Sequence, residues 1–254
     1  MTILDSIILG IIEGVTEFLP ISSTGHLILA GRILEIPPTE FLKTFEIAIQ
    51  LGAITAVLVL YFRSFTKLET FKKIFVAFLP TSIIGLLLYT VAKTYLLGNS
   101  TITLIALGIG GLVLIGFELA HKRKPAALET AEITYRQAAL IGVFQALAII
   151  PGVSRSAATI ICGLFLGISR QTIVEFSFLL AVPTIAAATG LDIFKNYELF
   201  STENMLHLGI GFFVSLIVAL ASIRFLLRFI RNNTFIPFGI YRIILAILFF
   251  IIIF

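Results

Sequence analysis

The stretch EGVTEFLPISSTGH, residues 13–26, places carboxylates, hydroxyl groups and a histidine inside sequence that is otherwise almost wholly apolar. A second stretch, PGVSRSAAT at residues 151–159, does the same with hydroxyl groups and an arginine. Each contains a proline and a glycine, which interrupt helices. A charge near the centre of a bilayer costs at least about 2.5–3.5 kcal/mol, so charges retained there indicate a functional site.

The composition predicts an all-α polytopic membrane protein. Of 254 residues, 59% are apolar and 13% are charged, about half the charged share of soluble domains. Several apolar blocks reach the roughly 20 residues that span a bilayer as a helix, whereas a barrel would show alternating segments of about ten residues. Asp5 and the lack of a basic flank argue against a cleaved signal peptide. The single cysteine, Cys162, excludes an internal disulfide, and the basic residues form no patch for nucleic acid.

Six apolar blocks are predicted to be full transmembrane helices: 41–62, 74–95, 102–120, 174–194, 206–229 and 236–254. Two further regions, 3–34 and 133–168, are broken in the middle by Pro20/Gly25 and by Pro151/Gly152. Each half has only about 14–18 residues, which is short for a spanning helix. Non-helical backbone at membrane depth requires surrounding protein or a water-filled cavity. We therefore expect two re-entrant helix-loop-helix hairpins.

The order of elements predicts an inverted-topology repeat within one integral membrane domain, 1–254. Each half, about 1–125 and 126–254, contains one hairpin followed by three spans, so the second half enters from the opposite side. The two broken elements should then meet near the midplane. Sliding the second half along the first so that Gly10 meets Gly142 also aligns Glu13 with Gln145, Ser22 with Ser154, and Gly31 with Gly163.

The basic loops predict the orientation. One side collects eleven basic residues: Arg63, Lys67, Lys72, Lys73, Lys122, Arg123, Lys124, Arg136, Arg224, Arg228 and Arg231. The other side has Arg32, Lys43, Lys93 and Lys195. By the positive-inside rule the first side is cytoplasmic. Both termini and the mouth of the first hairpin are therefore expected outside the cell.

Glu13 and Glu17 lie one turn apart on one face of a predicted helix. Two close carboxylates repel unless a cation lies between them, so they are candidate ligands for Mg²⁺ or Ca²⁺, which prefer oxygen donors. The alternative is a pair at a solvated helix end. Their apolar neighbours argue against it.

Ser22, Ser23, Thr24 and His26 follow Pro20 closely. A serine beside a histidine is the minimum for an activated nucleophile or a proton-transfer pair. Serine and threonine at a helix N-terminus are also ordinary caps, and His26 could equally be a hydrogen-bonded membrane histidine. The residues alone leave both interpretations open.

The second stretch is typical of an anion cradle. After Pro151 and Gly152 a helix begins with free N–H groups and a positive dipole end, which binds phosphate. Hydroxyl groups and the planar guanidinium of Arg155 can add donors. The alternative, that Arg155 extends to the interface, is disfavoured because apolar runs flank it on both sides.

Other polar residues give weaker signals. Glu46 and Gln50 are four residues apart and could line the same cavity. Solvation at helix ends accounts for Asp192, Glu175 and Glu118. His121 and His207 lie at loop edges and receive no role.

The two stretches resemble the signatures of the undecaprenyl-pyrophosphate phosphatase family, bacterial membrane enzymes also called bacitracin-resistance proteins. That family has an acidic E/Q-xxx-E helix leading into a Ser-Ser-x-Gly-His loop, here Glu13, Glu17 and residues 22–26. Its Pro-Gly-x-Ser-Arg-Ser-x-x-Thr loop matches residues 151–159. Residues 45–46 and 50–53 also resemble the family, and the block layout matches along the chain. Ala157 stands where the family often has glycine.

The resemblance implies a reaction: hydrolysis of undecaprenyl diphosphate to the monophosphate and inorganic phosphate at the outer face of the bacterial plasma membrane. It implies Ser23 as nucleophile and His26 as acid/base or alternative nucleophile. Glu13 and Glu17 are implied as metal or base residues. The expected phosphate-binding residues are Ser22, Thr24, Gly152, Ser154, Arg155, Ser156 and Thr159.

A secondary transporter or a polyprenyl-phosphate flippase is the main alternative, because inverted repeats with broken helices are transporter architecture. The serine and histidine beside paired carboxylates favour the enzyme, since a carrier needs no nucleophile. A structural scaffold would leave the buried charges unexplained. The sequence leaves open whether the protein is a homodimer and which cation it uses.

Overall fold

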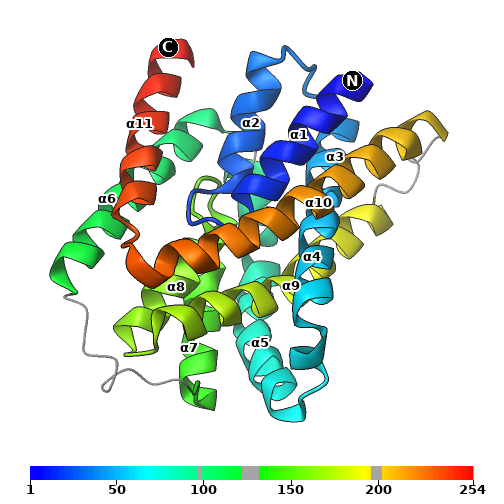
Figure 1. The fold of residues 1–254 in the computed structure, drawn as a ribbon. Coiled ribbons are helices and arrows are strands. Elements are labelled where there is room, and N and C mark those ends of the chain that lie inside the picture. Colours follow the sequence, from blue (N-terminus) through cyan, green and yellow to red (C-terminus); the bar gives the residue numbers. More distant parts are fainter. Residues whose placement is uncertain (97–98, 122–131, 196–201, 254) are drawn as a thin grey trace.

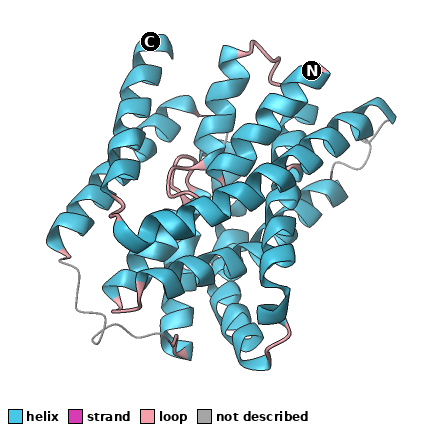
Figure 2. Ribbon diagram, in the orientation of Figure 1, coloured by secondary structure: helices cyan, strands magenta, loops and turns pink. Residues whose placement is uncertain are grey.

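The computed structural model describes residues 1–96, 99–121, 132–195 and 202–253, which form helices and loops without a strand (Figures 1 and 2). The helices are α1 (Ile3–Thr16), α2 (Ser23–Ile33), α3 (Glu40–Ala48), α4 (Gln50–Phe65), α5 (Leu68–Val91), α6 (Ser100–Ala120), α7 (Tyr135–Gln145), α8 (Arg155–Phe165), α9 (Arg170–Lys195), α10 (Thr202–Asn232) and α11 (Ile236–Ile253). A π-helix, Ala92–Leu96, follows α5, and a 3₁₀ helix, Ala146–Ile149, follows α7. The all-α prediction is confirmed for these ranges.

Five helical segments are long and apolar enough to cross a membrane: Glu40–Phe65, Leu68–Leu88, Ser100–Ala120, Arg170–Lys195 and Asn204–Asn232. They correspond to the first five predicted spans. The sixth, 236–254, is helical as α11, but its apolar part, Ile236–Ile252, is shorter than the other five. Large apolar side chains such as Leu87 and Phe194 are 76% and 79% exposed, as expected of a surface that faces lipid. The chain is a multi-pass membrane protein.

Both regions predicted to be broken consist of two short helices. The helices α1 and α2 have 14 and 11 residues, and α7 and α8 have 11 each. The first break runs from residue 17 to 22 around Pro20, whereas Gly25 lies inside α2, so Gly25 was wrongly assigned to the break. The second contains Pro151 and Gly152, whose φ of 91° suits glycine. The breaks lie as loops near the centre of the molecule (Figure 2).

The starts of these four short helices follow from local sequence. Thr2 and Thr134 each form a capping box, with Asp5 and with Gln137, at the starts of α1 and α7. Ser22 and Ser154 cap α2 and α8 through their side chains. The alignment of the two sequence halves that pairs Gly10 with Gly142 also pairs each cap of the first half with its counterpart in the second.

Helix pairing is also alike in the two halves. The main contacts of α1 are with α10, and those of α7 are with α5, while α6 packs on α11 (Figure 1). Glycines allow the close approach: a Cβ at Gly14 would lie 2.7 Å from the Ser215 carbonyl oxygen on α10. A Cβ at Gly142 would lie 2.8 Å from Cγ of Pro80 on α5. Small residues at such contacts are typical of membrane helices, because association there depends on close packing.

The first break is anchored in the largest apolar core cluster. Phe18, Leu19 and Ile21 are buried there with residues of α8 and α9. The ring of Phe18 packs edge-on against Phe178 at 5.1 Å between centroids. The apolar side chains of the break therefore fix its position in the core. Its polar side chains are free of that packing role.

The expected solvation of Glu118 at a helix end was wrong. Its side chain is only 1% exposed, and both carboxylate oxygens accept hydrogen bonds from Arg170 on α9. One oxygen also accepts the backbone N–H of Phe235, at 3.1 Å. A buried, bidentate ion pair with an added hydrogen bond joins α6, α9 and the start of α11.

We expect Gly142→Ala to lower the stability of the protein, because the new methyl group would overlap the α5 backbone at Ala77. Overpacking of this kind costs about 1–3 kcal/mol. The apparent melting temperature of the purified protein in detergent measures the effect. Gly116→Ala is the matched control, since a Cβ at that position would have no neighbour within 4 Å. Equal melting temperatures for the two variants would contradict the packing of α7 on α5.

Candidate active site

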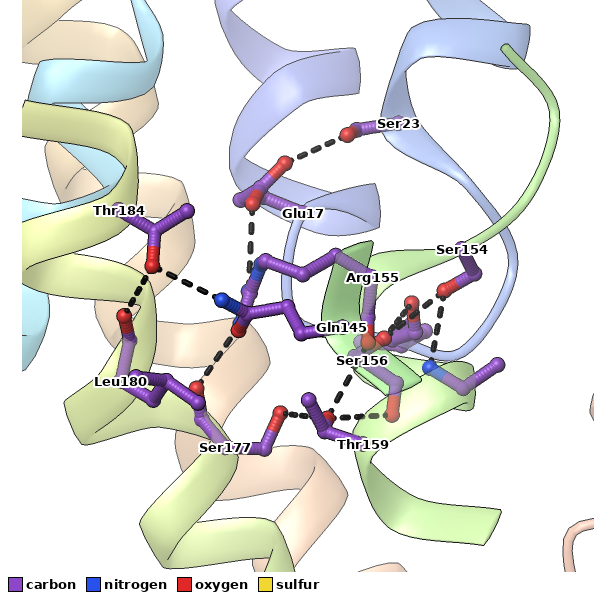
Figure 3. A network of polar contacts seen from close by, with 12 residues as sticks. Glu17, Ser23, Gln145, Ser154, Arg155, Ser156, Thr159, Ser177, Leu180 and Thr184 are labelled. Atoms are coloured by element: carbon purple, nitrogen blue, oxygen red, sulfur yellow. Dashed lines mark hydrogen bonds and ion pairs between the residues drawn. The ribbon is translucent and has the colours of Figure 1, made fainter. Parts of the chain in front are cut away.

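A continuous chain of polar contacts joins the two breaks (Figure 3). The Ser23 hydroxyl donates to Oε2 of Glu17 at 2.5 Å. Oε1 of Glu17 accepts from Nη2 of Arg155 at 3.2 Å, and Nη1 of Arg155 donates to the Ser177 carbonyl at 2.8 Å. The side chains of Arg155 and Glu17 are 11% and 6% exposed. The first break and the start of α2 thus supply a carboxylate and a hydroxyl group, and the start of α8 supplies a cation.

Among the hydroxyl groups at the start of α8, that of Ser156 ties the second break to the first. Ser156 donates to the Leu19 carbonyl at 2.9 Å. Because the Ser156 hydrogen is used there, the 2.9 Å contact between the hydroxyls of Ser154 and Ser156 requires Ser154 to donate. Thr159 contacts the Ser177 hydroxyl at 2.7 Å. These three side chains were predicted to bind phosphate, and in this structure their main contacts are within the protein.

Arg155 has one hydrogen-bond donor that is not used within the described part of the protein. Its Nε is buried and has no hydrogen-bond partner among the described residues, and the same holds for Oε1 of Gln145 and for both oxygens of Glu13. Unpaired buried polar atoms are rare and call for an explanation such as a missing ligand, ion or water. The atoms without partners include both donors and acceptors. They therefore suit a ligand that carries phosphate oxygens and a cation.

Glu13 fits a cation ligand better than a helix-end residue. Its side chain is fully buried, and Glu17 lies one turn further along. An ionised carboxylate without a partner is costly away from water. Within the described ranges no group of three or more acidic, histidine or cysteine residues is placed to bind a metal. Two carboxylates still fit Mg²⁺, which is typically held by one or two carboxylates plus substrate phosphates.

His26 is not paired with Ser23. Its Nδ1 lies 2.7 Å from the Ser22 carbonyl, so Nδ1 carries the hydrogen. Its Nε2 lies 2.8 Å from the hydroxyl of Tyr241 on α11. Both ring nitrogens are therefore engaged, and the group that contacts the Ser23 hydroxyl is Glu17.

The backbone beside Ser23 is strained. Ser22 has φ of 74°, a region that non-glycine residues seldom occupy, and such strain costs on the order of 1–3 kcal/mol. The Ser22 carbonyl accepts from His26, which helps to hold this conformation. Among the other predicted binding residues, Thr24 is partly buried in α2, and the Gly152 carbonyl accepts a hydrogen bond from α11.

The prediction from sequence missed two residues of α11. Tyr241 contacts His26, and the buried Arg242 donates to backbone carbonyls of both breaks. An arginine inside a predicted span is a costly feature that could have identified the second residue. Glu46 on α3 was predicted to line the cavity. Its Oε1 would lie 4.0 Å from a Cβ at Gly31 on α2, and its carboxyl group is close enough to interact electrostatically with Glu13.

Comparison with known proteins gives one consistent result. The family model described as bacitracin resistance protein BacA matches residues 6–248. An undecaprenyl-diphosphatase of Sulfurihydrogenibium sp. (strain YO3AOP1) is 52% identical over 252 residues, which cover 99% of each chain. Those of Wolinella succinogenes and Aquifex aeolicus are 51% and 46% identical, covering 98% of this chain and 97% and 98% of the relatives. A match of this extent, together with two buried breaks that carry the motif residues, places the chain in the BacA family of bacitracin resistance proteins.

Proposed function

We propose that this protein hydrolyses undecaprenyl diphosphate to undecaprenyl phosphate and inorganic phosphate. The observation that carries the proposal is the buried chain from Ser23 through Glu17 to Arg155. It joins a hydroxyl group, a carboxylate and a guanidinium, which can serve as nucleophile, base and phosphate-binding cation. Relatives that match nearly the whole chain are named undecaprenyl-diphosphatase. The reaction returns a lipid carrier to cell-wall synthesis, in keeping with the bacitracin resistance in the family's name.

Ser23 acts as the nucleophile, and Glu17 acts as its base. The Ser23 oxygen forms a bond to the terminal phosphorus while its proton passes to Glu17. The bond between that phosphorus and the bridging oxygen breaks, and undecaprenyl phosphate leaves with the electron pair. Water then attacks the phosphorus of the phosphoserine, and the bond between that phosphorus and the Ser23 oxygen breaks. Glu17 returns its proton to the Ser23 oxygen, so inorganic phosphate is released and both residues are restored. An adjacent base of this kind is what activates a serine hydroxyl.

Arg155 binds the terminal phosphate and neutralises charge that develops on it. Phosphoryl transfer is catalysed mainly by positioning and electrostatic stabilisation, and a guanidinium matches phosphate oxygens in two-pronged geometry. The support for this role is that its Nε has no hydrogen-bond partner among the described residues and that its Nη2 contact to Glu17 is 3.2 Å, so both nitrogens have donors that substrate could share.

Glu13 and Glu17 would hold a divalent cation, Mg²⁺ or Ca²⁺. The support is the fully buried Glu13 carboxylate, whose two oxygens lack partners in the part of the chain that the structure describes. When bound, the cation would supply further charge neutralisation for the diphosphate. A flippase or transporter is not favoured. Such a protein would need to bind the lipid phosphate but would not need a serine hydroxyl that is hydrogen-bonded to a carboxylate base.

We infer that the active site opens to the outer face of the bacterial plasma membrane and that both termini lie outside. The support is the distribution of basic residues between the loops. Three of these residues, Lys122, Arg123 and Lys124, fall outside the described residues. The matching caps and helix pairs of the two halves support the inverted repeat on which this orientation depends.

Ser23→Ala should reduce phosphate release from undecaprenyl diphosphate by about 10³-fold or more, because the attacking oxygen is absent. Residues that act as one unit give non-additive losses, so Ser23→Ala with Glu17→Gln should be little worse than Ser23→Ala alone. Initial rates of phosphate release by purified protein in detergent measure both effects. Ser82→Ala on α5 is the matched control. A Ser23→Ala variant with near-normal turnover would move the nucleophilic role to His26 or to water.

Chelation tests the cation. EDTA should abolish phosphate release, and Mg²⁺ or Ca²⁺ should restore it, because Glu13 and Glu17 would otherwise repel each other and the diphosphate. Glu13→Gln should raise the cation concentration that gives half-maximal rate, and should reduce the cation-dependent rise in melting temperature. Glu132→Gln, at an exposed residue, should change neither value. Full activity of the wild-type protein in chelator would exclude the cation.

A reporter that distinguishes periplasm from cytoplasm tests the orientation. Fused after Phe254, it should give a periplasmic signal, and inserted after Lys67, between α4 and α5, it should give a cytoplasmic signal. The reason is the excess of lysine and arginine on the side that contains Lys67. A cytoplasmic signal from the fusion after Phe254 would overturn the inferred orientation.

A further inference from the structure

Arg242 is a buried arginine that bonds to backbone carbonyls. Its side chain lies in the interior, with 1% of the residue exposed. Nε donates to the Leu107 carbonyl at 3.3 Å, and Nη2 donates to the Ala106 carbonyl at 3.1 Å, both on α6. The same Nη2 donates to the Gly152 carbonyl at 2.9 Å, and Nη1 donates to the Pro20 carbonyl at 3.4 Å. One guanidinium thus bonds to α6 and to both breaks.

The two carbonyls in the breaks are equivalent positions of the two halves. Pro20 and Gly152 are matched by the same alignment of the halves that pairs the helix caps. Each lies three residues before a residue of the proposed site: Pro20 precedes Ser23, and Gly152 precedes Arg155. The contact at one end therefore bears on the nucleophile, and the contact at the other bears on the phosphate-binding cation.

Glycines make room for this guanidinium. A Cβ at Gly110 on α6 would lie 2.7 Å from Cζ of Arg242. A Cβ at Gly152 would lie 3.0 Å from that of Ala106, so the second break also needs a small residue beside α6. The neighbouring Gly108 is different, because its Cβ would meet Cβ of Ala246 at an ordinary 3.9 Å. On α6, Gly110 is therefore required by the arginine, whereas Gly108 is not.

The charge of Arg242 is not neutralised by a carboxylate. None of the ion pairs in the described parts of the chain includes it, whereas Arg155 and Arg170 each have a carboxylate partner. Carbonyl dipoles solvate its donors, and a guanidinium has five N–H donors in one plane with which to use them. A lysine ammonium is compact and could not reach carbonyls in three separate segments.

We propose that Arg242 is a positioning residue that sets the distance between the two breaks, so that Ser23 and Arg155 meet the same phosphate. The inference rests on the proposed phosphatase function. Arg242 acts through the backbone at Pro20 and Gly152 and does not touch substrate. A shift of about 1 Å in reacting groups can cost about 10² in rate, so the role should be visible in kcat.

The test compares Arg242→Gln, Arg242→Lys, Gly110→Ala and Gly108→Ala with the wild-type protein. For each, the melting temperature in detergent and the kcat and KM for undecaprenyl diphosphate are measured. We expect Arg242→Gln and Gly110→Ala to lower kcat by about 10–100-fold with a KM change below about threefold. Arg242→Lys should not restore kcat, since it keeps the charge but loses the planar fork. Gly108→Ala should match the wild-type protein.

The double variant gives the sharpest result. Gly110→Ala is expected to act only through the guanidinium, so adding it to Arg242→Gln should cause no further loss of kcat.

If Arg242→Gln does not fold, the comparison of Gly110→Ala with its control Gly108→Ala tests the proposal by itself. A wild-type kcat in Gly110→Ala overturns the proposal. A rise in KM with unchanged kcat, or multiplicative losses in the double variant, also overturns it. An inactive wild-type protein would instead overturn the proposed function.

Discussion

Backbone that leaves the helix in the interior of a protein must find its hydrogen bonds there, and the two breaks of this chain are arranged around that constraint. The Leu19 carbonyl is satisfied by Ser156, the Ser22 carbonyl by His26, and the Pro20 and Gly152 carbonyls by Arg242. Each partner comes from another segment or from the helix that follows. The breaks thus stabilise each other, and the proposed site takes residues from both halves of the chain.

Buried charge follows the same logic. Glu17 is compensated by Arg155 and Ser23, and Glu118 is compensated by Arg170. Both oxygens of Glu13 lack a hydrogen-bond partner among the described residues, and Arg242 has carbonyls in place of a carboxylate. Removing one partner from a buried pair leaves an uncompensated charge, which is strongly destabilising. The two Glu13 oxygens are the buried acceptors at which the proposed cation would bind.

Much of the fold could be predicted because its signals are local. Apolar blocks of sufficient length predicted six spans, and five helices of the described residues have that length. Proline and glycine marked the two breaks, although Gly25 lies inside α2. Side-chain partners could not be predicted in the same way. The stretch around Ser23 and His26 reads as a serine–histidine pair, yet the contact to Ser23 comes from Glu17. Likewise Glu118 pairs with Arg170 on a different helix, and no local sequence pattern predicts that contact.

Arg242 was missed by the sequence prediction for a different reason. Its cost inside an apolar block was as visible as that of Arg155, but no polar neighbours or proline drew attention to it. Its role is apparent only when two carbonyls, one from each half of the chain, are seen at one guanidinium. A positioning contact between breaks is a property of the folded arrangement.

The proposed repeat also explains why the two halves carry different chemistry on matching positions. In the alignment of the two halves, Ser23 corresponds to Arg155, and Glu13 corresponds to Gln145. If both halves had kept glutamates, additional carboxylates would converge on one buried site, and their mutual repulsion would oppose both folding and anion binding. Gln145 instead donates to Thr81 and Thr184, which ties α7 to α5 and α9. Different residues at matching positions thus pair a carboxylate from one half of the chain, Glu17, with a guanidinium from the other, Arg155.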